Sequence, residues 1–301
     1  MSIGHAPPDI SPKTGSGAAA QPAGTATASE PDSAPALVPV VPSSARRTPV
    51  PRWVRRATGP LLLLALWQLA STFGVLPVDT LAPPSTIADA AIGLIGDGTL
   101  PAAMGISLQR VAVGLVIGGT AGTVLALLSG LSRLGEDLID ASVQMLRTVP
   151  WVGLIPLFII WMGIGEAPKV ALIALGTAFH LYLNVYAGIR GVDEQLIEAG
   201  GALGLGRWGL VRHVVLPGAL PGFMTGLRYS LATAWLALVF GESINADAGI
   251  GFLMNQAREF FRTDVIVVCL VVYAFLGLSA DLVVRTLERL LLQWRPTFKG
   301  Q

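Results

Sequence analysis

The fold of this chain is decided by residues 198–221, EAGGALGLGRWGLVRHVVLPGALP. This stretch is rich in glycine, carries charges of both signs and closes with two prolines, Pro217 and Pro221. Long apolar runs flank it on both sides. A segment that only joined two such runs could be shorter and would need few glycines. We therefore interpret it as a loop that another molecule recognises.

The composition is typical of an integral membrane protein. Of 301 residues, 52% are hydrophobic and 13% are charged, and the mean hydropathy is +0.65. Soluble domains carry about 25% charged residues, so the missing charge is the informative feature. A formal net charge of +1 argues against nucleic acid or another charged polymer as a partner.

Residues that carry catalysis or bind metals are scarce. Cys269 is the only cysteine and lies in an apolar run, so no disulfide or cysteine-based metal site can form within one chain. The three histidines, His5, His180 and His213, are scattered and match no HExxH pattern. The dipeptide Gly-Lys is absent, and with it any phosphate-binding P-loop, so any nucleotide hydrolysis would have to occur on another polypeptide. We predict no catalytic, cofactor-binding or metal-binding residue.

Three regions are predicted along the chain. Residues 1–57 form a cytoplasmic tail whose apolar content is too low to offset its ordering entropy, so we expect it to be disordered. The tail ends in a basic cluster and is not a secretory signal, because no apolar core follows an early basic region. Residues 58–296 form the transmembrane domain, and residues 297–301 form a cytoplasmic end.

Six segments approach or exceed the roughly 20 apolar residues that cross a hydrocarbon core. They are residues 59–76, 103–130, 139–164, 168–190, 219–242 and 264–291. The chain is therefore predicted to be an all-α membrane protein with about six transmembrane helices. Lys and Arg concentrate in alternate connections, which predicts that both termini lie in the cytoplasm and the segments 77–102 and 243–263 outside.

The second predicted span carries a small residue at every fourth position. These residues are Gly114, Gly118, Gly122, Ala126 and Gly130. Such spacing lets another helix approach closely, as in the GxxxG contact. The sequence leaves open whether that helix belongs to the same chain or to a second copy.

Four polar residues within the spans are candidates for a transport pathway, because charges in hydrocarbon are costly and often functional. They are Arg110, His180, Arg228 and Glu242. Arg110 and Glu242 lie near predicted span ends, where a side chain that reaches the interface is a sufficient explanation. Few carboxylates lie at mid-depth, which argues against a proton-driven carrier. Ser230 and His180 match no motif of an intramembrane protease.

The glycine-rich stretch is predicted to hold two short helices. Asp193 and Glu194 suit the start of the first helix, as an N-cap and as a charge that complements the helix dipole. Residues 204–206, Gly-Leu-Gly, break that helix, and residues 207–215 form a second one that ends at Leu-Pro. Pro217 then suits the entry to the fifth span, since proline is favoured in the first turn of a helix.

The same stretch resembles the EAA loop of binding-protein-dependent ABC importer permeases. That loop reads Glu-Ala-Ala, three residues, Gly, nine residues, Ile, one residue, Leu-Pro. The matching positions here are Glu198, Ala199, Gly200, Gly204, Val214, Leu216 and Pro217. Gly200 stands in place of the second alanine and Val214 in place of the isoleucine, while every spacing is kept. The resemblance extends over about residues 58–296.

The resemblance implies a type I ABC importer permease fold whose loop docks into an ABC ATPase subunit. It also implies a solute-binding protein on the outer side, at segments 77–102 and 243–263, and a second permease copy across the substrate path. Stretches such as residues 143–169, VQMLRTVPWVGLIPLFIIWMGIGEAPK, look like the sulfonate, nitrate and taurine branch, and the C-terminal part most resembles aliphatic sulfonate permeases. The alternatives are a stand-alone secondary transporter or channel and, less well supported, a membrane enzyme.

Overall fold

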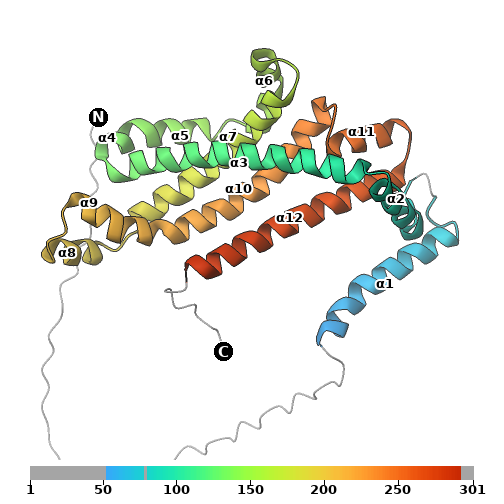
Figure 1. The fold of residues 1–301 in the computed structure, drawn as a ribbon, viewed down its shortest axis with the longest axis horizontal. Helices are drawn as coiled ribbons and strands as arrows, with labels where there is room; N and C mark the ends of the chain where they lie inside the picture. Colours follow the sequence, from blue (N-terminus) through green and yellow to red (C-terminus); the bar gives the residue numbers. More distant parts are fainter. Residues whose placement is uncertain (1–51, 78–79, 293–301) are drawn as a thin grey trace, which may run out of the picture. The chain divides into compact units, whose positions relative to one another are not determined.

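The computed structural model describes residues 52–77 and 80–292, and within these ranges the chain is helical without strands (Figure 1). The elements are α1 (Arg52–Thr72), α2 (Pro84–Gly96), α3 (Thr99–Leu131), α4 (Arg133–Gly135), η1 (Glu136–Asp140), α5 (Ala141–Leu146), η2 (Trp151–Leu154), α6 (Ile155–Met162), α7 (Glu166–Arg190), α8 (Glu194–Ala202), α9 (Arg207–Leu210), η3 (Val211–Val215), α10 (Leu216–Asn245), α11 (Ile250–Glu259) and α12 (Thr263–Leu291). The predicted all-α class is confirmed. Of the tail predicted to be disordered at residues 1–57, residues 1–51 lie outside the described residues, while residues 52–57 are helical and begin α1. The predicted cytoplasmic end at 297–301 also lies outside the described residues.

Four described helices are long and apolar enough to cross a membrane. They are α3, α7, α12 and the continuous helix Arg207–Ile244, which includes α10. A fifth candidate is the pair Arg133–Leu146 and Trp151–Met162, which bends by 83° in the region of the third predicted span. The apolar helix Ala57–Thr72, in the region of the first predicted span, is shorter. The bend falls at Pro150, whose extended backbone and missing N–H interrupt the helical ladder.

The small-residue stripe of α3 packs against α7 of the same chain. A Cβ added to Gly118 would overlap the carbonyl oxygen of Ala174 and the hydroxyl of Thr177. A Cβ on Gly122 would overlap the backbone of Ala178. The two helix backbones therefore approach so closely that only glycine fits at these positions. The question that the sequence left open is thereby answered in favour of an intrachain contact.

Helices α3 and α7 run parallel. Arg110, in the first half of α3, bonds to Glu166 at the start of α7, and near the last residues of both helices Gly130 packs on Ile189. The chain must therefore return from the end of α3 to the start of α7. The distance from Arg110 to Leu131 is roughly 30 Å at 1.5 Å per residue, so the bent segment α4–α6 covers the span of a hydrocarbon core.

Helix α10 runs antiparallel to α7 and packs along it (Figure 1). Ser230 donates a hydrogen bond to the carbonyl of Thr177 at 2.9 Å, which satisfies a buried hydroxyl without water. Between α3, α7 and α10 lies an apolar core that includes Val111, Leu172 and Leu238. Helix α12 packs on the other side of α10. This arrangement fixes two ends of the bundle, one at residues 191–217 and the other around α2 and α11.

Candidate functional site

The loop of residues 191–217, here called the joint loop, begins with a capped helix. The side chain of Asp193 accepts a hydrogen bond from the backbone N–H of Gln195 at 2.9 Å and so caps α8, as the sequence predicted. The helix ends at Ala202, and Gly204, whose φ of +83° lies in the left-handed region, turns the chain two residues later. The N–H of Leu205 then donates to the carbonyl of Gly200 at 3.1 Å and closes the turn. Gly204 is therefore required by the backbone conformation.

Gly200 is buried inside the joint loop. A Cβ at this position would lie 2.7 Å from Leu210 Cδ2 and 3.3 Å from Leu205 Cδ1. Val214 packs on the same spot, with its Cγ2 at 3.5 Å. The glycine that departs from the alanine of the EAA pattern thus lets α8 sit closely on α9 and η3. The neighbouring Gly201 faces open space.

The helix in the second part of the joint loop continues into the fifth predicted span without a break. We expected a short helix that stops at Leu-Pro, but α9, η3 and α10 form one continuous helix. Pro217 lacks the N–H that would bond the carbonyl four residues earlier. Residues 211–215 adopt a π turn instead, in which the N–H of Leu216 donates to the carbonyl of Val211. The proline is therefore accommodated by a change of hydrogen-bond register.

The joint loop presents apolar side chains to its surroundings. Leu196 is 57% exposed, Leu203 85% and Trp208 74%. Glu198 and Ala199 are exposed between them on α8. Large apolar side chains that gather on one exposed loop are typical of a contact with another protein. Of the other motif positions, Leu216 and Pro217 are exposed and Val214 is half-buried.

At the other end of the bundle, Arg110 and Glu242 are buried and bonded to each other. Arg110 Nη1 donates to Glu242 Oε1 at 2.5 Å and to the carbonyl of Ala248 at 2.7 Å. Glu242 also accepts from Ser107 at 2.7 Å and from Tyr273 at 2.9 Å. Both charged groups therefore have their partners inside the protein. Their side chains do not reach the membrane interface, which the sequence had allowed as an explanation for them.

Two further charges complete this cluster, and the sequence had not connected them with it. Glu166 accepts from Arg110 Nε and Nη2, both at 2.5 Å, and from Lys169 at 3.2 Å. Lys169 is 3% exposed and also pairs with the exposed Asp247 at 3.6 Å. The signal was present as a lone lysine at the start of an apolar run, where a buried partner is expected.

Arg228 belongs to a separate group of charges on α10 and α12. Its Nη2 donates to Glu288 at 2.6 Å, and its Nε lies 3.6 Å from Asp281. All three side chains are partly exposed. These pairs lie away from the Arg110 cluster, nearer the end of α12, where such side chains can reach an aqueous phase.

His180 lies in the middle part of α7 and has aromatic and hydroxyl neighbours on α10. Its Nδ1 lies 2.9 Å from the carbonyl of Gly176 and 3.4 Å from the hydroxyl of Thr233. The ring of Tyr229, which is 55% exposed, lies 6.4 Å from the histidine ring. The four candidate residues therefore lie at three separate positions in the bundle. Arg110 and Glu242 are together, His180 lies at a second position, and Arg228 lies at a third.

These features define a class of protein: an integral membrane protein of packed apolar helices with an exposed helical loop suited to another subunit. Residues 118–293 match the family described as the binding-protein-dependent transport system inner membrane component. The chain belongs to this family, and it is a permease component rather than an enzyme.

Relatives agree with this assignment. The chain is 46% identical over 254 residues to a protein of Escherichia coli (strain K12) that carries the name aliphatic sulfonates transport permease protein SsuC, with 83% of this chain and 97% of the relative covered. It is 33% identical over 254 residues to the taurine transport system permease protein TauC of the same strain, with 82% and 92% covered. The predicted resemblance to the sulfonate and taurine branch is confirmed.

The fold is that of a known transporter class. A crystal structure of an amino acid ABC transporter with histidines matches with a TM-score of 0.54 and 17% identity, over 62% of this chain and 91% of the other. The predicted type I permease fold of ABC importers is confirmed. The roles of the motif residues and of the four polar residues remain predictions.

Proposed function

We propose that this chain is the permease subunit of an ATP-driven importer for aliphatic sulfonates or a related small anion such as taurine or nitrate. Its similarity to permeases named for sulfonates and taurine supports this substrate class. The observation that carries the ATP-driven part of the proposal is the joint loop. Its EAA spacing, its capped helix and its exposed apolar side chains suit docking into a separate ATPase subunit.

The proposed coupling residues divide into two roles. Glu198 and Ala199 lie exposed on α8, where they would contact the ATPase, and Leu216 and Pro217 lie exposed at the start of α10. Gly200, Gly204 and Val214 shape the loop, because the first and last pack inside it and Gly204 turns it. Motion of a docked ATPase would reach the membrane directly, since α9, η3 and α10 are one helix.

In this proposal the joint loop and both termini face the cytoplasm of a bacterial inner membrane. The positions of lysine and arginine support this orientation. The ends of the bundle near α2 and α11 then face outward, toward a solute-binding protein. Two copies of the chain would enclose the substrate path within the lipid bilayer, and ATP would be hydrolysed on the ATPase subunits alone.

The four polar candidates have different places in this scheme. His180 and Arg228 are partly exposed on α7 and α10, so they are the pair proposed to face the solute. Arg110 and Glu242 bond to each other and are buried. We propose that they hold the outward end of the pathway in shape rather than contact the solute.

The test is transport by the reconstituted assembly. The chain is purified with its ATPase, placed in liposomes, and supplied with the solute-binding protein and a labelled short alkanesulfonate. Uptake that needs ATP, the ATPase and the binding protein together is the expected result. Uptake by this chain alone, insensitive to vanadate, would instead identify a secondary transporter or channel.

A further inference from the structure

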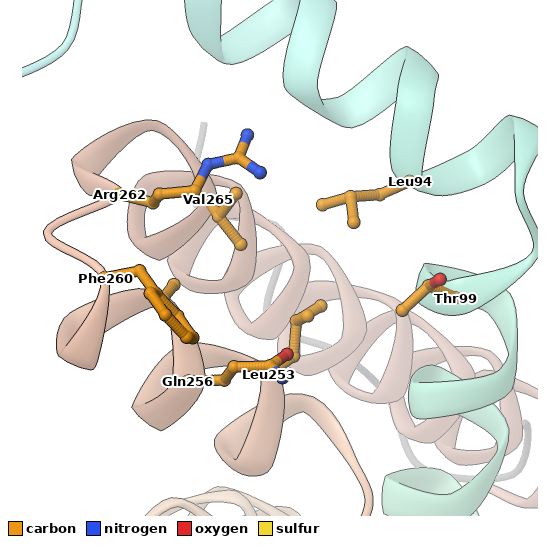
Figure 2. Close-up of a pocket in the computed structure, with 8 residues that line it drawn as sticks. Leu94, Thr99, Leu253, Gln256, Phe260, Arg262 and Val265 are labelled. Atoms are coloured by element: carbon orange, nitrogen blue, oxygen red, sulfur yellow. The ribbon is translucent and has the colours of Figure 1, made fainter.

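A two-part groove lies where α2, the start of α3, α11 and the start of α12 meet. One part has a volume of about 300 Å³ and the adjoining part about 450 Å³. Leu94 and Arg262 line both parts and form the boundary between them. Figure 2 shows Leu94 and Thr99 on one side of the first part, facing Phe260 and Arg262 on the other.

The first part of the groove is mainly apolar. Leu253 and Val265 form its walls together with Leu94, and Phe260 lies at its rim with 69% of its surface exposed. An open apolar recess of this volume has room for one large side chain of another molecule.

The second part of the groove is acidic. Asp89, Asp97 and Asp264 line it, and Arg262 is the one basic residue among its lining residues. Arg262 pairs with Asp264 at 2.8 Å, which leaves the other two carboxylates in excess. The backbone N–H of Thr99 donates to Asp97 at 2.9 Å and lowers the pKa of Asp97 from its ordinary value. The charge of this part favours an occupant that carries positive charge.

The turn at residues 260–262 adds an independent sign of recognition. Phe261 has a φ of +54°, which is rare for a bulky residue, and its side chain is 86% exposed. The turn is held by a bond from the N–H of Arg262 to the carbonyl of Ala257 at 2.8 Å. A strained turn that keeps two phenyl rings exposed next to a recess is typical of a binding surface.

We propose that this groove docks a loop of the solute-binding protein that carries a lysine or arginine beside a large apolar side chain. The inference rests on the proposed function, in which this end of the bundle faces outward. It goes further by stating the chemistry of the contact. The basic side chain would enter between Asp89 and Asp97, and the apolar one would pack on Leu94 and Phe260. The excess of carboxylates disfavours anionic lipid headgroups as the occupant.

The experiment measures binding of the purified, alkanesulfonate-loaded binding protein to the complete transporter in nanodiscs. Asp89→Lys reverses a charge in the acidic part, and Phe260→Ser removes the ring at the rim of the apolar part. Glu259→Lys makes the same charge reversal on an exposed residue outside the groove lining. Each groove variant is expected to raise Kd about tenfold. The effect of Asp89→Lys should shrink at high salt, and Glu259→Lys should change Kd less than twofold.

Assembly with the ATPase and basal ATP hydrolysis report whether each variant is folded. Wild-type Kd in both folded groove variants would overturn the inference and leave the proposed function intact. A groove variant whose ATP hydrolysis differs from wild type by the same factor with and without the binding protein would also overturn the inference. The substitution would then affect the transporter's fold or its contact with the bilayer, and not the docking of the binding protein. Failure of the binding protein to bind or stimulate the wild-type transporter would instead contradict the proposed function.

Discussion

Arg110 and Glu242 stand 132 positions apart in the chain, yet they form a 2.5 Å ion pair inside the helix bundle. The Arg110 side chain is 3% exposed and that of Glu242 is fully buried. Around the pair, α3, α7, α12, the turn before α11 and the first turn of α11 converge, through the bonds to Ser107, Glu166 and Tyr273 and to the backbone at Ala248 and Gly251. The pair thus connects several helices at the end of the bundle that carries the groove.

Removal of one partner of this pair should be more harmful than removal of both charges. Arg110→Met leaves a buried carboxylate unpaired and should lower the free energy of unfolding by about 3–5 kcal/mol. In Arg110→Met/Glu242→Gln the charge is gone, while the amide oxygen still accepts hydrogen bonds. Thermal unfolding of the purified proteins should rank the double variant as the more stable. The opposite ranking would show that the unpaired Glu242 carboxylate is not what destabilises Arg110→Met.

The contact between α3 and α7 should tolerate no side chain at Gly118. Valine there would overlap the backbone of Ala174, and overpacking of this kind costs about 1–3 kcal/mol or more. Gly105 lies on the same helix with open space around it, so Gly105→Val is the matched control. The yield of monodisperse protein from membranes should fall for Gly118→Val only. Equal yields of Gly118→Val and Gly105→Val would mean that the close approach of α3 and α7 is not needed for a stable protein.

The turn of the joint loop should depend on Gly204. Alanine in the left-handed region costs about 1–2 kcal/mol, so Gly204→Ala should loosen the end of α8. Gly206 has a φ of −68° and free space around it, so Gly206→Ala should leave the left-handed turn at Gly204 intact. Hydrogen exchange of the amides of residues 200–205 is the measurement. If both variants show the same protection from hydrogen exchange as the wild type, the end of α8 does not depend on the left-handed turn at Gly204.

Charge reversal at Glu198 should uncouple transport from ATP hydrolysis. Glu198 lies exposed on α8 at the first motif position, where the proposed ATPase contact is made. The Glu198→Lys variant should insert normally into the membrane, yet its uptake should fall tenfold or more. The substitution removes a negative charge from the proposed interface and puts a positive charge there that has no partner. Gln195→Lys, which adds a lysine to the same helix, is the control. Normal uptake and normal co-purification of the ATPase with Glu198→Lys would contradict the assigned role.

Local features of the structure could be predicted from the sequence because they depend on neighbours in the chain. Apolar length predicted the four long membrane helices of the described residues, Asp193 predicted the start of α8, and glycine predicted its end. The continuous helix through Pro217 was missed, because the π turn that accommodates the proline is set by the packing of Val215 and the rest of α10 around it.

The sequence by itself determined that this is a helical membrane protein with a recognisable docking loop, since hydrophobicity and motif spacing are properties of contiguous residues. Only the tertiary structure decided which helix fills the glycine stripe of α3, that Arg110 pairs with Glu242, and that α2 and α11 enclose a groove. Those outcomes depend on groups far apart in the chain, and many pairings of apolar helices would satisfy the same hydrophobic pattern. Steric fit at the glycines and the cost of an unpaired buried charge select one of them.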